Sequence, residues 1–173
     1  MERGAATSPV VPRVLPGGEI RGLAAPGACP AFTSSWGAVR ATQLRLEPGE
    51  LPEGCLVNHL VAMNLGGEAR FDANVGGRGW ETHQAPHHGL TVIPAELPYA
   101  SRARQAADLL LVELQPDFVA DVVGAASTAT ALPVVLGARD PFAEHVLLAL
   151  AHEARRGSRS ATPCGSWRTT STR

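Results

Sequence analysis

The chain has 173 residues and a mass of 18.1 kDa, which suits one domain with flanking tails. Hydrophobic residues make up 45% and charged residues 18% of it, which excludes a wholly disordered or collagen-like chain. The net charge of −1 is unevenly spread: all 16 acidic residues precede position 154, and residues 154–173 hold five of the 15 arginines. Because phosphate binding needs clustered cations, this acidic body argues against a nucleic-acid surface, and we expect no specific DNA binding.

We expect neither a membrane span nor a secretory signal in this sequence. Its longest unbroken apolar run, residues 146–151, is too short to cross a bilayer. Residues 1–30 lack the apolar stretch of a signal peptide. The three cysteines show no C-x-x-C spacing, which argues against a disulfide framework or a zinc knuckle. We therefore expect a cytoplasmic protein.

Short apolar segments separated by turns follow a lead-in rich in Gly, Pro, Ala and Ser. Residues 1–37 have no regular period and predict a flexible arm, and regular structure is expected from Ala38. Alternation at Thr42, Leu44 and Leu46 predicts a strand, which a turn at residues 47–50 ends. Further strands are expected at residues 60–65, 69–75, around Trp80, at 90–93 and at 109–114, with a two-residue hairpin turn at Gly76-Gly77. Residues 38–115 thus predict a β-barrel or sandwich.

Two helices are expected within residues 116–156. Pro116 suits the first turn of one helix. Asp140 and Pro141 suit the N-cap and first position of the other, which ends at Arg156 before Gly157. On this second helix, Phe142, Val146, Ala149 and Leu150 are expected on one face, with Leu147 and Leu148 widening it. Residues 157–173 hold no large aliphatic side chain and predict a disordered tail.

Local signatures of catalysis or metal binding are weak. His59, His83, His87 and His88 form no His-x-His pair, so they favour unliganded histidines over a metal site. Glu50 and Glu53 lie in a solvated turn, and no Gly-x-Ser-x-Gly or phosphate loop occurs. Trp36 and Trp80 suit the core or the mouth of a barrel. Alternatively, Trp80 and Tyr99 line an apolar ligand pocket, and the sequence leaves both readings open.

Residues 36–155 resemble the N-terminal cupin-like sensor domain of AraC-type transcriptional regulators. The segments that carry the resemblance are Leu46–Pro52, His59–Gly67, Gly89–Tyr99, Leu114–Val119 and Arg139–Leu148. The resemblance implies a mainly β fold, a cupin-like jelly-roll barrel followed by two C-terminal helices. Gly54, Leu56 and Asn58 stand at the first-motif metal-ligand positions of enzymatic cupins, and Tyr99 stands at the second. We therefore expect no metal, no other cofactor and no enzymatic activity.

The function implied is a ligand-sensing and dimerisation module, truncated before the helix-turn-helix half of such regulators. Its partners would be a small-molecule effector and a second copy of the chain. The ligand-pocket candidates are His59, Met63, Trp80 and Tyr99, and the dimer-interface candidates are Leu147 and Leu148. A small cupin enzyme with an atypical or absent metal site is the alternative. A fragment without independent function is a third reading, because the Ser/Thr/Arg-rich tail suits a premature or out-of-frame end.

Overall fold

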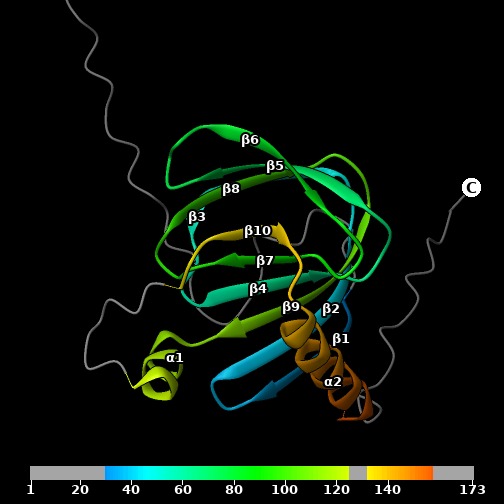
Figure 1. Ribbon diagram of the computed structural model, residues 1–173, viewed down its shortest axis with the longest axis vertical. Coiled ribbons are helices and arrows are strands. Elements are labelled where there is room, and N and C mark those ends of the chain that lie inside the picture. Colours follow the sequence, from blue (N-terminus) through cyan, green and yellow to red (C-terminus); the bar gives the residue numbers. More distant parts are fainter. Residues whose placement is uncertain (1–29, 125–131, 158–173) are drawn as a thin grey trace, which may run out of the picture.

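The computed structural model describes residues 30–124 and 132–157, which form ten strands and two helices (Figure 1). The strands are β1 (Pro30–Trp36), β2 (Val39–Leu46), β3 (Gly49–Cys55), β4 (His59–Asn64), β5 (Ala69–Val75), β6 (Trp80–Ala85), β7 (Leu90–Ile93), β8 (Pro98–Ala103), β9 (Ala107–Leu114) and β10 (Val135–Ala138). The helices are α1 (Pro116–Val123) and α2 (Pro141–Gly157). Neither helix in these ranges is long and apolar enough to span a membrane.

The strands form two sheets whose order is that of a jelly roll. The six-stranded sheet has the order β1-β2-β9-β4-β7-β10, and the four-stranded sheet has the order β3-β8-β5-β6. All pairings are antiparallel, and strands β2 to β9 pass between the sheets as in a double-sheet jelly roll. The predicted mainly β, cupin-like fold with two C-terminal helices is confirmed. Within the described residues it is a sandwich rather than a closed barrel.

The centre of the six-stranded sheet is buried on both faces, which explains why β9 reads as a continuous apolar run. Leu111 belongs to the core between the sheets, with Leu60 and Ile93. Its neighbour Leu110 points to the opposite face and belongs to a second core beneath α2, with Met63. Because successive side chains of a strand alternate between faces, both leucines are buried, at 2% and 0% exposure.

Several elements lie outside the predicted set. Strand β1 occupies residues predicted as part of the arm, because it pairs with the edge of β2. Strand β3 occupies part of the predicted turn. It lies at a sheet edge with an irregularity between Leu51 and Gly54, which is where a strand accommodates Pro52. Strands β8 and β10 were not predicted, and the β5–β6 turn has four residues rather than two. Residues 1–29 of the predicted arm and 158–173 of the predicted tail lie outside the described residues.

Helix α2 begins as predicted but buries a different face. The Asp140 carboxylate accepts hydrogen bonds from the Phe142 and Ala143 N–H groups, at 3.0 and 3.1 Å, which makes it the N-cap. Phe142 is 80% exposed and Val146 is 51% exposed, so neither packs on the sheet. The buried stripe consists of Leu147, Ala151 and Ala154, with Ala143 and Leu150 beside it. Small alanine side chains allow the helix to approach the sheet closely. A search for the face with the largest apolar side chains therefore selects the wrong face of α2.

Candidate functional site

A small cavity lies between the two sheets at one end of the sandwich, with a volume of about 90 Å³. Strands β4, β6 and β8 end at this cavity, and β5, β7 and β9 begin there. Its apolar wall is formed by Leu46, Leu60, Ala62, Ala69, Phe71, Ala85, Ala103, Ala107, Leu109 and Leu111, and its polar lining includes Asn64, Arg70, Thr91, Tyr99, Ser101 and Gln105. Ligand sites have this character, apolar with a few placed polar groups.

Tyr99 supplies the buried phenol of this cavity. Burial raises the pKa of its hydroxyl, and the neighbouring Ser101 hydroxyl partly offsets that rise. The phenol is therefore protonated at neutral pH and can donate a hydrogen bond to a ligand oxygen. Tyr99, one of the four predicted pocket residues, lines this cavity.

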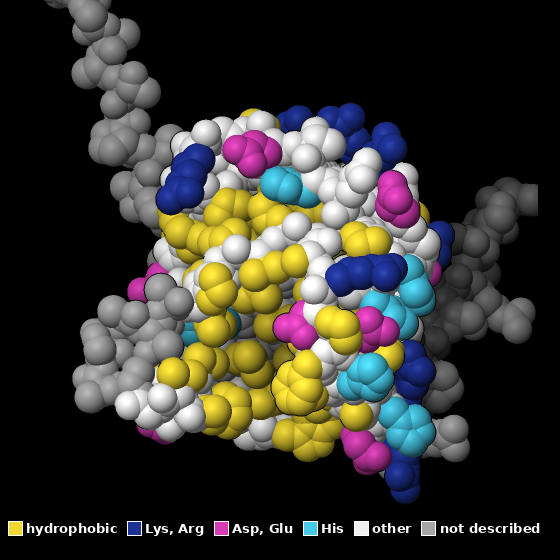
Figure 2. All heavy atoms as spheres, viewed as in Figure 1, with side chains coloured by type: hydrophobic (Ala, Val, Ile, Leu, Met, Phe, Trp, Pro, Cys, Tyr) yellow, Lys and Arg dark blue, Asp and Glu magenta, His cyan; other side chains and the backbone are white. Residues whose placement is uncertain are grey.

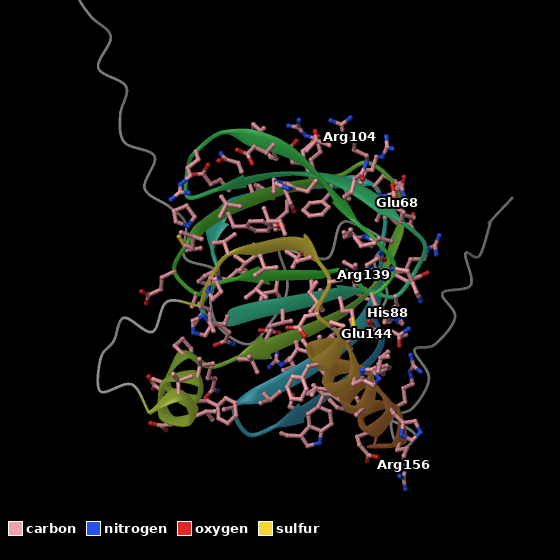
Figure 3. All side chains as sticks on the ribbon, in the orientation of Figure 1. Glu68, His88, Arg104, Arg139, Glu144 and Arg156 are labelled. Carbon is pink, nitrogen blue, oxygen red and sulfur yellow. The ribbon has the colours of Figure 1, made fainter. Side chains whose placement is uncertain are left out.

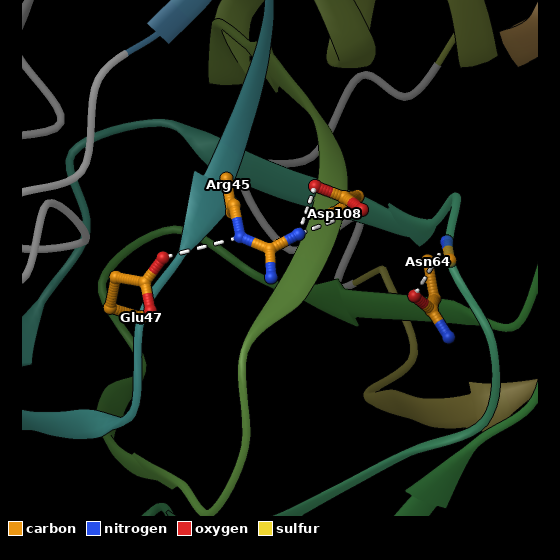
Figure 4. A network of polar contacts seen from close by, with 5 residues as sticks. Arg45, Glu47, Asn64 and Asp108 are labelled. Carbon is orange, nitrogen blue, oxygen red and sulfur yellow. Dashed lines mark hydrogen bonds and ion pairs between the residues drawn. The ribbon is translucent and has the colours of Figure 1, made fainter.

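Asn64 fixes the loops at the mouth of the cavity. Its side-chain amide donates to the carbonyl oxygens of Gly67, Ala85 and Pro86 at 2.6, 2.9 and 3.1 Å. Its carbonyl oxygen accepts the Gly66 N–H at 3.1 Å (Figure 4). One buried side chain thus joins the loop after β4 to the loop after β6. Where β2 ends and β9 begins, Arg45 bridges Glu47 and Asp108, with N–O distances of 3.2 and 3.4 Å (Figure 4).

The loop between β6 and β7, residues 86–89, connects the cavity to α2. Gly89 lines the cavity, and the adjacent His88 Nδ1 lies 2.6 Å from Glu144 Oε1 in the first turn of α2 (Figure 3). Arg139, just before the helix, donates to the His87 carbonyl oxygen at 3.3 Å. His88 has a φ of 60°, a left-handed conformation that non-glycine residues seldom adopt, so the ordered loop holds some backbone strain.

Three of the predicted pocket residues lie away from the cavity. Met63 has the opposite parity to Leu60 and Ala62 on β4, so it points into the core beneath α2. His59 has the same parity as Met63, and its Nδ1 accepts the Ala95 N–H at 2.9 Å. Trp80 is 44% exposed, with the Arg102 guanidinium 4.5 Å from its ring centroid. The prediction that these three line the cavity is corrected.

Burial lowers the pKa of His59 from its ordinary value of 6.5. A histidine that binds protons less readily when folded contributes stability that is complete above its ordinary pKa and lost as the pH falls below it. We expect the free energy of unfolding to fall as the pH drops below about 6.5, the ordinary pKa of histidine, and to fall less in a His59→Gln variant. Urea denaturation at a series of pH values measures both slopes, and equal slopes would contradict this account.

The positions of the usual cupin metal ligands carry an unsuitable set of donors. Gly54 has no side chain, and Leu56 is an apolar residue packed against the inter-sheet core. The Asn58 amide donates to Glu113 Oε2 at 3.4 Å, and Tyr99 remains as a neutral phenol. Within the described ranges, no three His, Cys, Asp or Glu residues come together as a metal-binding group. These residues do not fit a divalent transition metal, which prefers imidazole, thiolate or carboxylate ligands.

Asn64 and Glu144 have no functional signal in the sequence, and His88 stands out there only as a candidate metal ligand. A lone Asn at a strand end and a His before Gly89 are typical of turns. Glu144 lies 56 positions from its partner His88, and no local spacing relates the two. The one available signal was the Asp140 cap, which fixes the first turn of α2 and therefore the place of Glu144.

No protein-family model matches this chain, and no curated protein matches it. Solved structures similar to it include a cupin domain from Bordetella pertussis Tohama I, with 18% identity and a TM-score of 0.43, covering 54% of this chain and 99% of that one. A cupin superfamily protein from Desulfitobacterium hafniense DCB-2 shows 12% identity and a TM-score of 0.42, over 51% and 77% of the two chains. A cupin-2 domain protein from Shewanella frigidimarina shows 14% and 0.41, over 50% and 80%. The jelly-roll fold of this chain follows from the order of its own strands.

Proposed function

We propose that this chain is a non-enzymatic ligand-sensing and dimerisation module of the AraC type, acting in the cytoplasm. The observation that supports this is the double role of loop 86–89, which borders the inter-sheet cavity at Gly89 and holds α2 through His88. A ligand that alters the cavity mouth therefore acts on the contact that positions the helix. In a full regulator, that shift would reposition the DNA-reading half.

The mechanism is a population shift between two placements of α2. A ligand changes the balance only by its differential affinity for the two placements. Asn64 supplies the differential contact, because its amide holds Ala85 and Pro86 while its backbone ends β4 at the cavity. Ligand contact with this mouth tightens or loosens loop 86–89 and thereby the His88–Glu144 pair.

The cavity restricts the effector to a small molecule. A volume of about 90 Å³ lies below the roughly 300–1,000 Å³ of sites for drug-sized ligands. The lining favours a compact, mainly apolar molecule with one oxygen that accepts a hydrogen bond from Tyr99. A larger effector would require the sheets or the mouth loops to separate.

The dimer interface belongs to the outward face of α2. Leu147 is only 8% exposed and packs on its own sheet, so the prediction that it lies in the interface is corrected. Leu148, at 37% exposure, remains available, and Phe142 and Val146 are more exposed still. Apolar side chains cover the molecular face between α2 and α1 (Figure 2). Closed two-fold pairing buries such a surface, and sedimentation of a monomer at tens of micromolar would contradict it.

The alternative, a small cupin enzyme with an atypical site, differs in what it requires of the cavity. It needs a group that takes or gives a proton at the substrate. The cavity offers a phenol whose pKa is raised, and it holds no histidine or carboxylate within the described residues. No observation of the described residues favours this alternative.

The experiment measures whether cavity occupancy changes the mobility of α2. The full chain is titrated with small alcohols and ketones, such as butanol and cyclopentanone, and amide hydrogen exchange is followed in residues 141–150. We expect a binder that perturbs the Ala62 and Thr91 amides to change exchange in α2. A Glu144→Gln variant should bind the same molecule but uncouple the helix, because the charge-assisted hydrogen bond to His88 is weakened.

Two outcomes would overturn the proposal. In one, none of the small probes perturbs the cavity amides. In the other, a probe binds and the α2 exchange rates do not move, which would make the cavity a packing defect rather than a sensor. An Ala62→Leu variant is the matched control, because its larger side chain fills the cavity from β4 and should abolish binding of the probe.

A further inference from the structure

A second hollow lies at the other end of the sandwich, between the β5–β6 hairpin and β10. Its volume is about 320 Å³, within the range of small-molecule sites. Strand β5 spans the distance between the two hollows, with Ala69 at the cavity and Val75 at this groove. The two share no lining residue among those described. Apolar side chains gather between β6 and β10, and basic, acidic and histidine side chains border them (Figure 2).

The body of the groove is apolar. Val75 and Leu97 form the wall on the side of the four-stranded sheet. The opposite wall is formed by Val134, which precedes β10, and by Leu136 within β10. Val134 is 43% exposed although it is a large aliphatic residue, so its surface is open to a ligand. An apolar molecule seated here would remove exposed aliphatic surface from water on both walls.

The polar groups of the groove lie on one rim. They are Arg78 from the hairpin turn and Glu81 and His83 from β6. Gly76, Gly77 and Gly79 flank Arg78 with positive φ angles of 64°, 70° and 106°. The Gly79 N–H donates to the Asn74 side-chain oxygen at 3.0 Å, which fixes the turn and the place from which Arg78 extends.

Arg78 differs from the arginines on the outer face of the same sheet. Arg104 is paired with Asp72 at 2.9 Å, and Arg102 is paired with Glu50 at 3.1 Å. No carboxylate pairs with Arg78 within residues 30–124 and 132–157. Its guanidinium is permanently charged and offers two parallel N–H groups that match a carboxylate. Arg78 therefore suits a carboxylate ligand in this groove.

We propose that the groove between the β5–β6 hairpin and β10 binds a small monocarboxylate with an apolar body, its carboxylate on Arg78 and its body between Val75 and Leu136. Glu81 on the same rim opposes a second negative charge, so a dianion such as phosphate is disfavoured. His83 lies between the apolar floor and the rim. Its ring centroid is 5.6 Å from that of Phe71, and its Nε2 is 3.9 Å from Glu81 Oε2 at the rim.

The test uses benzoate as the probe on the full chain, with benzyl alcohol and inorganic phosphate as comparison probes. Amide chemical shifts map the site, and calorimetry gives the affinity. We expect benzoate to perturb residues 75–81 and Leu136 and to bind more tightly than either comparison probe. Arg78→Gln should weaken benzoate at least about tenfold, because a hydrogen bond to a charged group contributes about 1.5–3 kcal/mol.

Arg156→Gln is the matched control, since it removes an exposed arginine at the far end of α2 (Figure 3) and should leave benzoate binding unchanged. The Ala62→Leu variant also leaves it unchanged, because the cavity and the groove are separate. Three results would overturn the proposal: no binding of benzoate at millimolar concentration, equal affinity in Arg78→Gln, or benzyl alcohol binding as tightly as benzoate.

Discussion

Leu147→Ala is expected to lower the free energy of unfolding by about 3 kcal/mol, as leucine truncation in a core does. Leu147 is 8% exposed and belongs to the core that α2 forms with Met63 and Leu110 on the six-stranded sheet. Truncation removes the apolar contacts between this side chain and the sheet. It also leaves a void, which the strands close only in part because their hydrogen bonds hold them in place. Urea denaturation followed by circular dichroism measures the loss.

Leu148→Ala is the matched control on the next residue of the same helix. Its side chain is 37% exposed, so we expect a loss below about 1 kcal/mol. Both substitutions exchange the same residue types, so helix propensity cancels and the difference reports packing alone. Similar losses in the two variants would show that α2 does not pack as described.

Leu148→Glu tests the proposed dimer surface by sedimentation, because this substitution leaves the core beneath α2 intact. Leu147→Glu is unsuitable for that test, because it would place a charge in the core and disrupt the packing of α2 on the sheet.

The elements that local chemistry determines were predictable from the sequence. The bounds expected for β5 and β7 agree with the structure, because each is an apolar or alternating run between turn residues. The start of α2 was predictable because Asp140 and Pro141 act within one helical turn. The elements that were missed depend on distant partners. Strand β1 exists through its pairing with β2, and β3 carries the composition of a turn but pairs with β8.

The candidate site depended on the same distinction. Tyr99 was a candidate only because it is one of eight aromatic residues in the chain, since the strand β8 that carries it was not predicted. Met63 was not excluded by its type, because only the parity of β4 relative to the cavity decides which face it lines. The faces of α2 also required the structure, since an alanine-lined stripe packs on the sheet while Phe142 points outward. The only sequence signal at Arg78 is its glycine neighbours, which predict a turn. That this turn lies opposite β10 depends on the tertiary fold and could not be predicted.

Gly137→Ala is expected to destabilise the protein by about 3 kcal/mol and to displace β10, because a left-handed backbone and a steric overlap both oppose the new methyl group. Gly137 has a φ of 68° and lies where the pairing of β10 with β7 is irregular. A Cβ atom there would overlap the Gln84 carbonyl oxygen on β6 and lie 3.0 Å from the Gln84 carbonyl carbon. Neither backbone atom can move without disturbing its own sheet.

Gly77→Ala is the matched control, because Gly77 has a similar φ of 70° but no heavy atom within 4 Å of the added carbon. It should cost only the backbone strain, about 1–2 kcal/mol. The excess in Gly137→Ala then measures how closely β10 packs across the edges of β6 and β7. The Gly137 N–H donates to the Thr91 hydroxyl at 3.3 Å, so displacement of β10 in Gly137→Ala should speed amide exchange in this strand. Because Leu136 lines the groove, the same variant should also bind benzoate more weakly. Equal losses in the two glycine variants would mean that β10 moves freely against β6, and that the groove has no fixed outer wall.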